Sequence, residues 1–115
     1  MLKPLLLLIP LVTLLACTSG GGREIPITAN ENECTPASVT AKPGEKLTFV
    51  VENKAKGDRE FEGTEGTKVE ETVIPSGRTR KINYTTPNSE SSQKLKCYIP
   101  GGPTTLIELK VTKTP

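Results

Sequence analysis

Residues 38–53 read SVTAKPGEKLTFVVEN and contain the pattern that decides the fold. Leu47, Phe49 and Val51 occupy every second position, which is the spacing of a strand that buries one of its faces. Residues 42–45, Lys-Pro-Gly-Glu, have the composition of a turn, because Pro fixes φ and Gly tolerates a positive φ. The stretch therefore predicts a β-strand that is entered from a tight turn.

The same alternation recurs along the chain. It is clear at residues 107–111 and shorter around residues 25–27, 82–84 and 95–97, with Gly, Pro, Asn and Ser between these segments. No stretch has a capped period of 3.6 residues, so no helix is expected. We expect an all-β domain of about seven or eight short strands, packed as a small antiparallel sandwich. The polar segments 53–59, 64–67 and 87–93 are predicted to be loops.

The N-terminus has the parts of an export signal. Lys3 precedes an apolar segment, residues 5–15, which ends in Leu14-Leu15-Ala16-Cys17, a run that resembles the lipobox of bacterial lipoproteins. Eleven helical residues rise only about 16 Å, well short of a bilayer core of about 30 Å, and Pro10 interrupts them. The segment therefore does not predict a membrane-spanning helix.

The resemblance to a lipobox implies three parts of the chain. Residues 1–16 would be a signal peptide, residues 17–22 a lipidated Cys17 with a flexible Gly/Ser tether, and residues 23–115 a single domain. The alternative is an ordinary signal peptide that leaves Cys17 as a free thiol. We expect a protein of the bacterial cell envelope, anchored to a membrane through lipid and facing the periplasm or the cell exterior.

The charge balance excludes one class of partner. Lys3 is the only charged residue before Cys17, so 14 of the 15 basic side chains remain, against 13 acidic ones. A nucleic-acid partner would require a clustered basic face and usually stacking aromatic residues, and the chain has no Trp, two Tyr and two Phe. We expect no nucleic-acid partner, while an envelope protein partner remains open.

Two cysteines remain in the expected domain, Cys34 and Cys97. A disulfide is the simplest interpretation, because small exported domains need covalent support and their compartment is oxidising. If the two cysteines lie at one rim of the sandwich, a metal site is also open to them. Thiolates suit Cu(I), yet Cu(II) in an oxidising space drives such thiols to the disulfide.

The composition excludes several kinds of chemistry. The chain has no His, and its only Met is Met1. A blue-copper centre of two imidazoles and a thiolate cannot form, and neither can Ser-His-Asp or Cys-His catalysis. A pair of carboxylates on one strand face, Glu60 and Glu62, leaves a hydrolase conceivable. A sugar hydrolase would also require an aromatic platform, so no enzyme is expected.

Several segments together resemble a known family. Cys34-Thr35-Pro36, the stretch 38–53, the triplet Glu60-Phe61-Glu62 and Leu95-Lys96-Cys97 are similar to a cupredoxin-like domain. They are most similar to the small domain of the EfeO family of periplasmic iron-uptake proteins. Two features of that family are not expected here. One is its helical domain, and the other is the acidic strand with Met before the second cysteine, which is replaced by Lys94-Leu95-Lys96.

The resemblance implies a Greek-key cupredoxin-like sandwich and a metal-associated function. Cys34 and Cys97 would bind copper or iron, and Glu60 and Glu62 would form a weaker carboxylate site. The favoured hypothesis is a lipid-anchored protein that binds or delivers a transition metal without blue-copper electron transfer. The alternative is a structural or protein-interaction lipoprotein that uses no metal.

Overall fold

The computed structural model describes residues 22–114, and this part of the chain forms a β-sandwich of nine strands. No helix that is long and apolar enough to cross a membrane occurs among these residues. The strands are β1 (Arg23–Ala29), β2 (Cys34–Thr35), β3 (Ser38–Ala41), β4 (Lys46–Asn53), β5 (Arg59–Gly63), β6 (Thr72–Ile74), β7 (Thr79–Thr85), β8 (Ser91–Tyr98) and β9 (Thr104–Val111). The predicted all-β class is confirmed, and the short β2 and β6 raise the count above the expected one.

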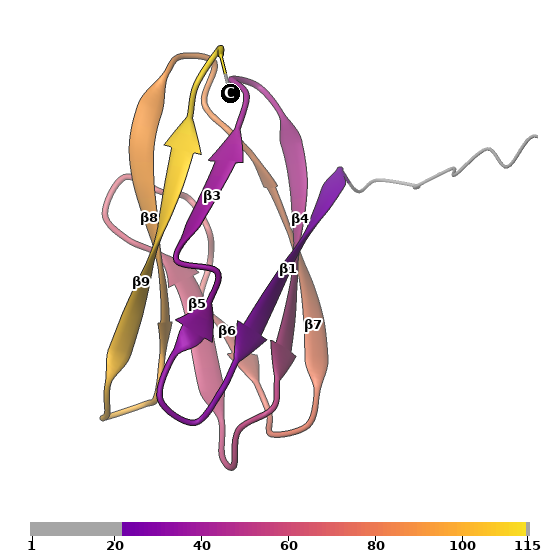
Figure 1. Ribbon diagram of the computed structural model, residues 1–115, viewed down its shortest axis with the longest axis vertical. Helices are drawn as coiled ribbons and strands as arrows, with labels where there is room; N and C mark the ends of the chain where they lie inside the picture. Colours follow the sequence, from indigo (N-terminus) through magenta and orange to yellow (C-terminus); the bar gives the residue numbers. More distant parts are fainter. Residues whose placement is uncertain (1–21, 115) are drawn as a thin grey trace, which may run out of the picture.

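The strands form two packed sheets (Figure 1). One sheet has the order β2-β1-β4-β7 and the other the order β3-β9-β8-β5-β6. Two pairs, β1 with β4 and β3 with β9, are parallel, whereas an antiparallel sandwich was predicted. The reason is that β3 joins the opposite sheet, so β1 and β4 become neighbours that run in the same direction. The alternation that reveals a strand does not reveal which sheet it joins.

The core confirms the alternation read from the sequence. Leu47, Phe49 and Val51 on β4 are all buried, with no more than 1% of their surface exposed. They face the equivalent inward positions of the other sheet, and the rings of Phe49 and Phe61 are 5.5 Å apart between centroids. Tyr84, in the segment 82–84 of the predicted alternation, is half-buried against the core, and its hydroxyl donates to Gln93 Oε1 at 2.6 Å.

Two predicted loops are partly wrong, and in the first of them, residues 53–59, both end residues belong to strands, Asn53 to β4 and Arg59 to β5. Residues 91–93, placed in a Ser-rich loop, begin β8 and pair with residues 109–111 of β9. The alternation of apolar residues did not reveal this part of the strand, because the inward positions are taken by the polar residues Ser91 and Gln93. By contrast, the predicted turn before β4 is present. Gly44 has a φ of 68°, and Glu45 N–H donates to Lys42 O at 3.2 Å.

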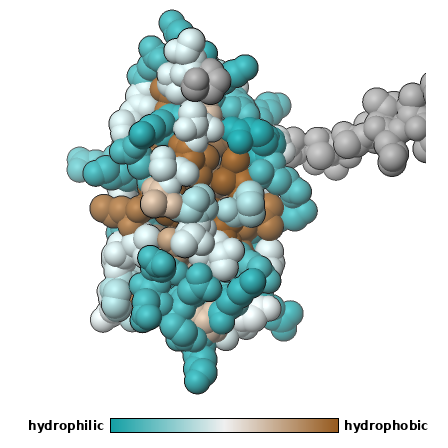
Figure 2. Space-filling model, viewed as in Figure 1, coloured by the Kyte–Doolittle hydropathy of each residue, from teal (hydrophilic) through white to brown (hydrophobic). Residues whose placement is uncertain are grey.

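The outer surface is mostly hydrophilic, with hydrophobic side chains visible at mid-height on one face (Figure 2). Val73 and Leu106 are the large apolar residues that stay exposed among those described, at 44% and 51%. Loops gather at two ends of the sandwich. We call the end that holds the β1–β2, β4–β5, β6–β7 and β8–β9 connections the disulfide end. The opposite end, where β1 begins, is the N-terminal end.

Candidate functional site

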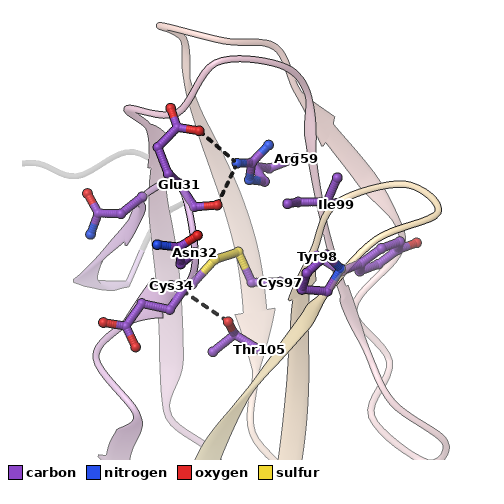
Figure 3. Close-up of a pocket in the computed structure, with 11 residues that line it drawn as sticks. Glu31, Asn32, Cys34, Arg59, Cys97, Tyr98, Ile99 and Thr105 are labelled. Carbon is purple, nitrogen blue, oxygen red and sulfur yellow. Dashed lines mark hydrogen bonds and ion pairs between the residues drawn. A yellow bond between two sulfur atoms is a disulfide. The ribbon is translucent and has the colours of Figure 1, made fainter.

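The two cysteines of the domain are joined at the disulfide end (Figure 3). Cys34 opens β2, opposite Ala29 of β1, while Cys97 points inward from β8 beside Phe61. Their Cα atoms are 6.2 Å apart, and 5% and 1% of the two residues is exposed. Cys34 N–H also donates to Thr105 Oγ1 at 3.2 Å. The bonded form of the pair, which the sequence left open beside a metal site, is confirmed.

The bond links segments that are far apart in sequence. Its cysteines are separated by 63 residues, and closing such a loop stabilises a fold by about 4 kcal/mol in the chain-entropy model. It also connects the two sheets, because β2 belongs to one and β8 to the other. The pair therefore has a structural role in the oxidised protein.

A buried arginine shares this end of the sandwich. Arg59 is 5% exposed and points inward from the start of β5 (Figure 3). Its guanidinium donates to Asp58 O at 3.0 Å and to Glu31 O at 3.2 Å, and the Glu31 carboxylate lies 3.9 Å away. The ion pair balances the charge of the guanidinium only in part, because the Glu31 side chain is largely exposed to solvent. A buried guanidinium disfavours a cation bound next to it.

The space next to the disulfide is small. A hollow of about 10 Å³ is lined by the two cysteines, Arg59, Tyr98, Ile99, Pro103, Thr105 and residues 30–33. This volume is room for one water molecule at most. The hollow is therefore no binding pocket for an organic ligand.

The predicted carboxylates lie elsewhere, on the outer face of β5. Glu60 and Glu62 do share one strand face, as their spacing predicted, with the buried Phe61 between them on the other face. Glu62 Oε1 is 3.0 Å from Lys96 Nζ and accepts a hydrogen bond from the Tyr98 hydroxyl at 3.0 Å. These two contacts, Lys96 first, hold the pKa of Glu62 below its usual value. Glu62 is thus an ionised carboxylate whose charge is already balanced by Lys96.

Tyr98 organises the same outer surface. Its hydroxyl also lies 2.7 Å from Glu71 Oε2, and Lys96 Nζ sits 5.0 Å from the centre of its ring. The Glu71 carboxylate first, then burial and Glu62, raise the pKa of Tyr98 well above its ordinary range. The hydroxyl therefore stays protonated as a donor, and the cluster is a network of hydrogen bonds and ion pairs.

The structure keeps the two sets of predicted site residues on different faces. Cys34 and Cys97 lie between the sheets, while Glu60 and Glu62 face outward. Within residues 22–114, no three His, Cys, Asp or Glu side chains are grouped so that they could hold a metal ion. The carboxylate site remains a prediction.

Two residues that matter here were not singled out from the sequence. Arg59 shares its parity with Phe61, so the alternation that predicts an inward Phe61 also predicts an inward Arg59. Tyr98 follows Cys97 and so faces outward, but its pairing with Glu60 depends on strand register. The predicted lipidation site, Cys17, and the predicted signal peptide lie outside the described residues.

Comparison with known proteins agrees with this architecture. A family model described as the cupredoxin-like domain matches residues 5–90. No curated protein sequence matches the chain.

Solved structures superpose on most of the chain. Auracyanin A, a "blue" copper protein from Chloroflexus aurantiacus, does so with a TM-score of 0.68 and 15% identity, covering 80% of this chain and 100% of its own. Reduced auracyanin from Roseiflexus castenholzii gives a TM-score of 0.65 and 15% identity over 81% of this chain and 99% of that one. Copper nitrite reductase from Nitrosomonas europaea gives a TM-score of 0.67 and 10% identity over 82% of this chain and 50% of the enzyme. At such identities the likeness concerns the fold.

Proposed function

Because the chain belongs to the cupredoxin-like domain family, we propose that it is a cell-envelope lipoprotein whose domain is a disulfide-stabilised interaction module without bound metal. The observation that carries this proposal is the bond between Cys34 and Cys97. It occupies both thiols of the described domain, and its neighbour is the buried cation Arg59.

The residues of this chain do not fit the copper of its structural relatives. A blue-copper centre requires two imidazoles and a thiolate, usually with an axial Met. The sequence contains no His and no Met beyond Met1. Both candidate thiolates are bonded to each other, so residues 22–114 leave no soft ligand between the sheets. This chain has the fold of these relatives, but it does not have the imidazole, thiolate and Met ligands of a blue-copper centre.

The competing hypothesis is a transition-metal carrier, as the similarity to the EfeO family implies. The observation in its favour is that Cys34 and Cys97 lie close enough to bind one soft ion such as Cu(I) once a dithiol reductant has opened the bond. The positive charge of Arg59 acts against this binding. Iron would require harder ligands, and Glu62 is engaged by Lys96 and Tyr98.

Metal titration separates the two functions. The mature protein, extracted from membranes in detergent, should show no free thiol at Cys34 or Cys97 before reduction. Calorimetric titration with Cu(I), Cu(II) and Fe(II) should give no tight binding to the oxidised form. The Cys34→Ala/Cys97→Ala and Glu60→Gln/Glu62→Gln variants serve as controls. Tight Cu(I) binding confined to the reduced form would establish the carrier instead, and two titratable thiols in the native protein would contradict the structural role.

The proposed location depends on the Leu14 to Cys17 run. Metabolic labelling with palmitate should modify the wild-type protein and should fail for Cys17→Ala, which should no longer be processed as a lipoprotein. A mature wild-type protein that begins with an unmodified residue and is washed from membranes by salt would exclude the lipid anchor.

A further inference from the structure

β7 is an open edge of the four-stranded sheet. It pairs with β4 on one side, and no strand of the described residues lies on the other (Figure 1). The other three terminal strands, β2, β3 and β6, have two to four residues, whereas β7 has seven. Most of β7 is exposed, and it contains neither Pro nor Gly. Among the described residues it is therefore the longest edge open to another strand.

The hydrogen bonds that flank β7 reveal which of its backbone groups are free. Asn53 N–H donates to Arg78 O and Thr86 N–H donates to Glu45 O, each at 2.9 Å. Because alternate residues of an antiparallel strand face their partner, the even positions of β7 bond to β4. The N–H and C=O groups of the odd positions point outward; these are Thr79, Lys81, Asn83 and Thr85. Within residues 22–114, only Thr79 O among them has a partner, the Arg80 guanidinium at 3.3 Å.

Positive charge is concentrated at the N-terminal end of this edge. Arg78, Arg80 and Lys81 are exposed, and only Lys81 has a carboxylate within ion-pair distance among the described residues, Glu24 at 3.3 Å. The other end, residues 82–85, is uncharged. β7 itself contains no acidic residue, so a second copy of β7 would not supply the complementary charge.

We propose that the outer edge of β7 is a docking site for an extended segment of a partner envelope protein that carries acidic residues near its C-terminal end. The segment adds antiparallel to β7, since this orientation is the more stable one and matches its acidic end to Arg78 and Arg80. The backbone bonds provide affinity, and the charges fix the direction. This inference rests on the proposed function, because it specifies the surface of the interaction module.

A peptide of defined sequence tests the edge. The probe is the N-acetylated, C-amidated peptide TVTVEVEE, added to the mature protein in detergent micelles, with TVTVKVKK as the charge control. Binding of the acidic peptide should slow amide hydrogen exchange at Lys81, Asn83 and Thr85. Exchange should change little at Ile82 and Tyr84, whose amides already bond to β4. The basic peptide should give no such alternating protection.

Three variants sharpen the test. Arg80→Gln should weaken binding about two- to fivefold, the range of an exposed ion pair, whereas the control Lys94→Gln on the other sheet should not. Lys81→Pro removes one outward N–H without removing a bond to β4, and it should abolish binding. If Lys81→Pro does not fold, the binding of Arg80→Gln and the alternating protection of the wild type still test whether the peptide docks on β7.

Other results would overturn the proposal. These are absence of protection at saturating peptide, equal protection of odd and even positions, or equal binding of both peptides. Protection that rises with protein concentration without peptide would assign the edge to a second copy. None of these results bears on metal binding, so the metal titration tests the proposed function separately.

Discussion

The two ends of the sandwich are closed by different means. At the disulfide end, the closing groups are buried: the Cys34–Cys97 bond, Arg59 and Asn53, whose exposure is 0%. At the N-terminal end, the main pair is the exposed ion pair between Arg23 and Glu45, at 2.8 Å. Within residues 22–114, a covalent bond closes the disulfide end alone, where it is accompanied by the buried Arg59 and Asn53.

The buried polar groups at the disulfide end leave little space beside the disulfide itself. Asn53 donates to Gly57 O at 2.9 Å and to Ile74 O at 2.8 Å, and it accepts from Ala55 N–H at 2.9 Å. It thereby ties the β4–β5 and β6–β7 connections together. Bonds within the protein fill the space beside the disulfide, where a hollow of about 10 Å³ remains. An open hollow of about 490 Å³ lies further out at the same end, lined by Glu31, residues 56–59, Ile99 and Pro100. The fold therefore fixes where side chains converge, and the residue types decide whether they bind a ligand or each other.

The largest effect should come from removing the disulfide. Cys34→Ala/Cys97→Ala should lower the free energy of unfolding by about 2–5 kcal/mol, because the unfolded chain regains the freedom of a 63-residue loop. Urea denaturation measures this. Reduced wild-type protein is the matched control and should unfold at a similar urea concentration. A loss below about 1 kcal/mol would mean that the buried polar groups suffice at this end.

Asn53→Ala should be the next most damaging change. It leaves two carbonyls and one N–H without their partner, which should cost about 2–3 kcal/mol. Asn32→Ala, an exposed change at the same end, is the control and should change stability by no more than about 0.5 kcal/mol. Equal effects of the two variants would contradict the clamping role of Asn53.

The sequence predicted the part of this architecture that depends on local pattern. The alternation at Leu47, Phe49 and Val51 predicted a buried strand face. Arg59, at the end of a predicted loop, begins β5 instead and points inward with Phe61. The turn chemistry placed Gly44 correctly. These features depend on residues within a few positions of each other.

What the sequence could not predict depends on partners far along the chain. The parallel pairing of β1 with β4 follows from β3 joining the other sheet. Two cysteines at one rim allow a bond or a shared ion, and it is the joined sulfur atoms in the structure, with the Cα atoms 6.2 Å apart, that identify the bond. Glu60 and Glu62 were separated from the cysteines by strand parity, but their contacts with Tyr98 and Lys96 depend on the register of β5 and β8.

At the N-terminal end, Thr86→Val should have a smaller effect. Thr86 is 3% exposed; its hydroxyl donates to Lys42 O at 2.6 Å and accepts from Glu45 N–H at 2.8 Å. Valine keeps the shape and loses both bonds, which should cost about 1–2 kcal/mol because nearby water replaces part of them. Thr85→Val, an exposed change, is the control. A loss as large as that of Asn53→Ala would erase the contrast between the ends.

The smallest effect concerns the exposed pair Arg23–Glu45. Arg23→Gln should lower the free energy of unfolding by at most about 1 kcal/mol, since the two side chains are 50% and 25% exposed. The Arg23 guanidinium first, and then the Lys42 N–H, hold the pKa of Glu45 below its ordinary value of 4.5. A carboxyl whose pKa is lower in the folded state contributes stability above its unfolded pKa and loses it as the pH falls through the folded pKa.

The difference between wild type and Arg23→Gln should therefore be present at neutral pH and shrink as the pH falls below 4.5. Urea denaturation over this pH range measures it, and high salt at neutral pH should shrink it as well, because both partners are exposed to solvent. A difference that stays constant with pH and salt would assign the effect to the bond from Arg23 to Thr40 O, at 2.9 Å, which involves no titrating group. In that case a bond from a side chain to a backbone carbonyl would close the N-terminal end, as the bonds of Asn53 do at the disulfide end.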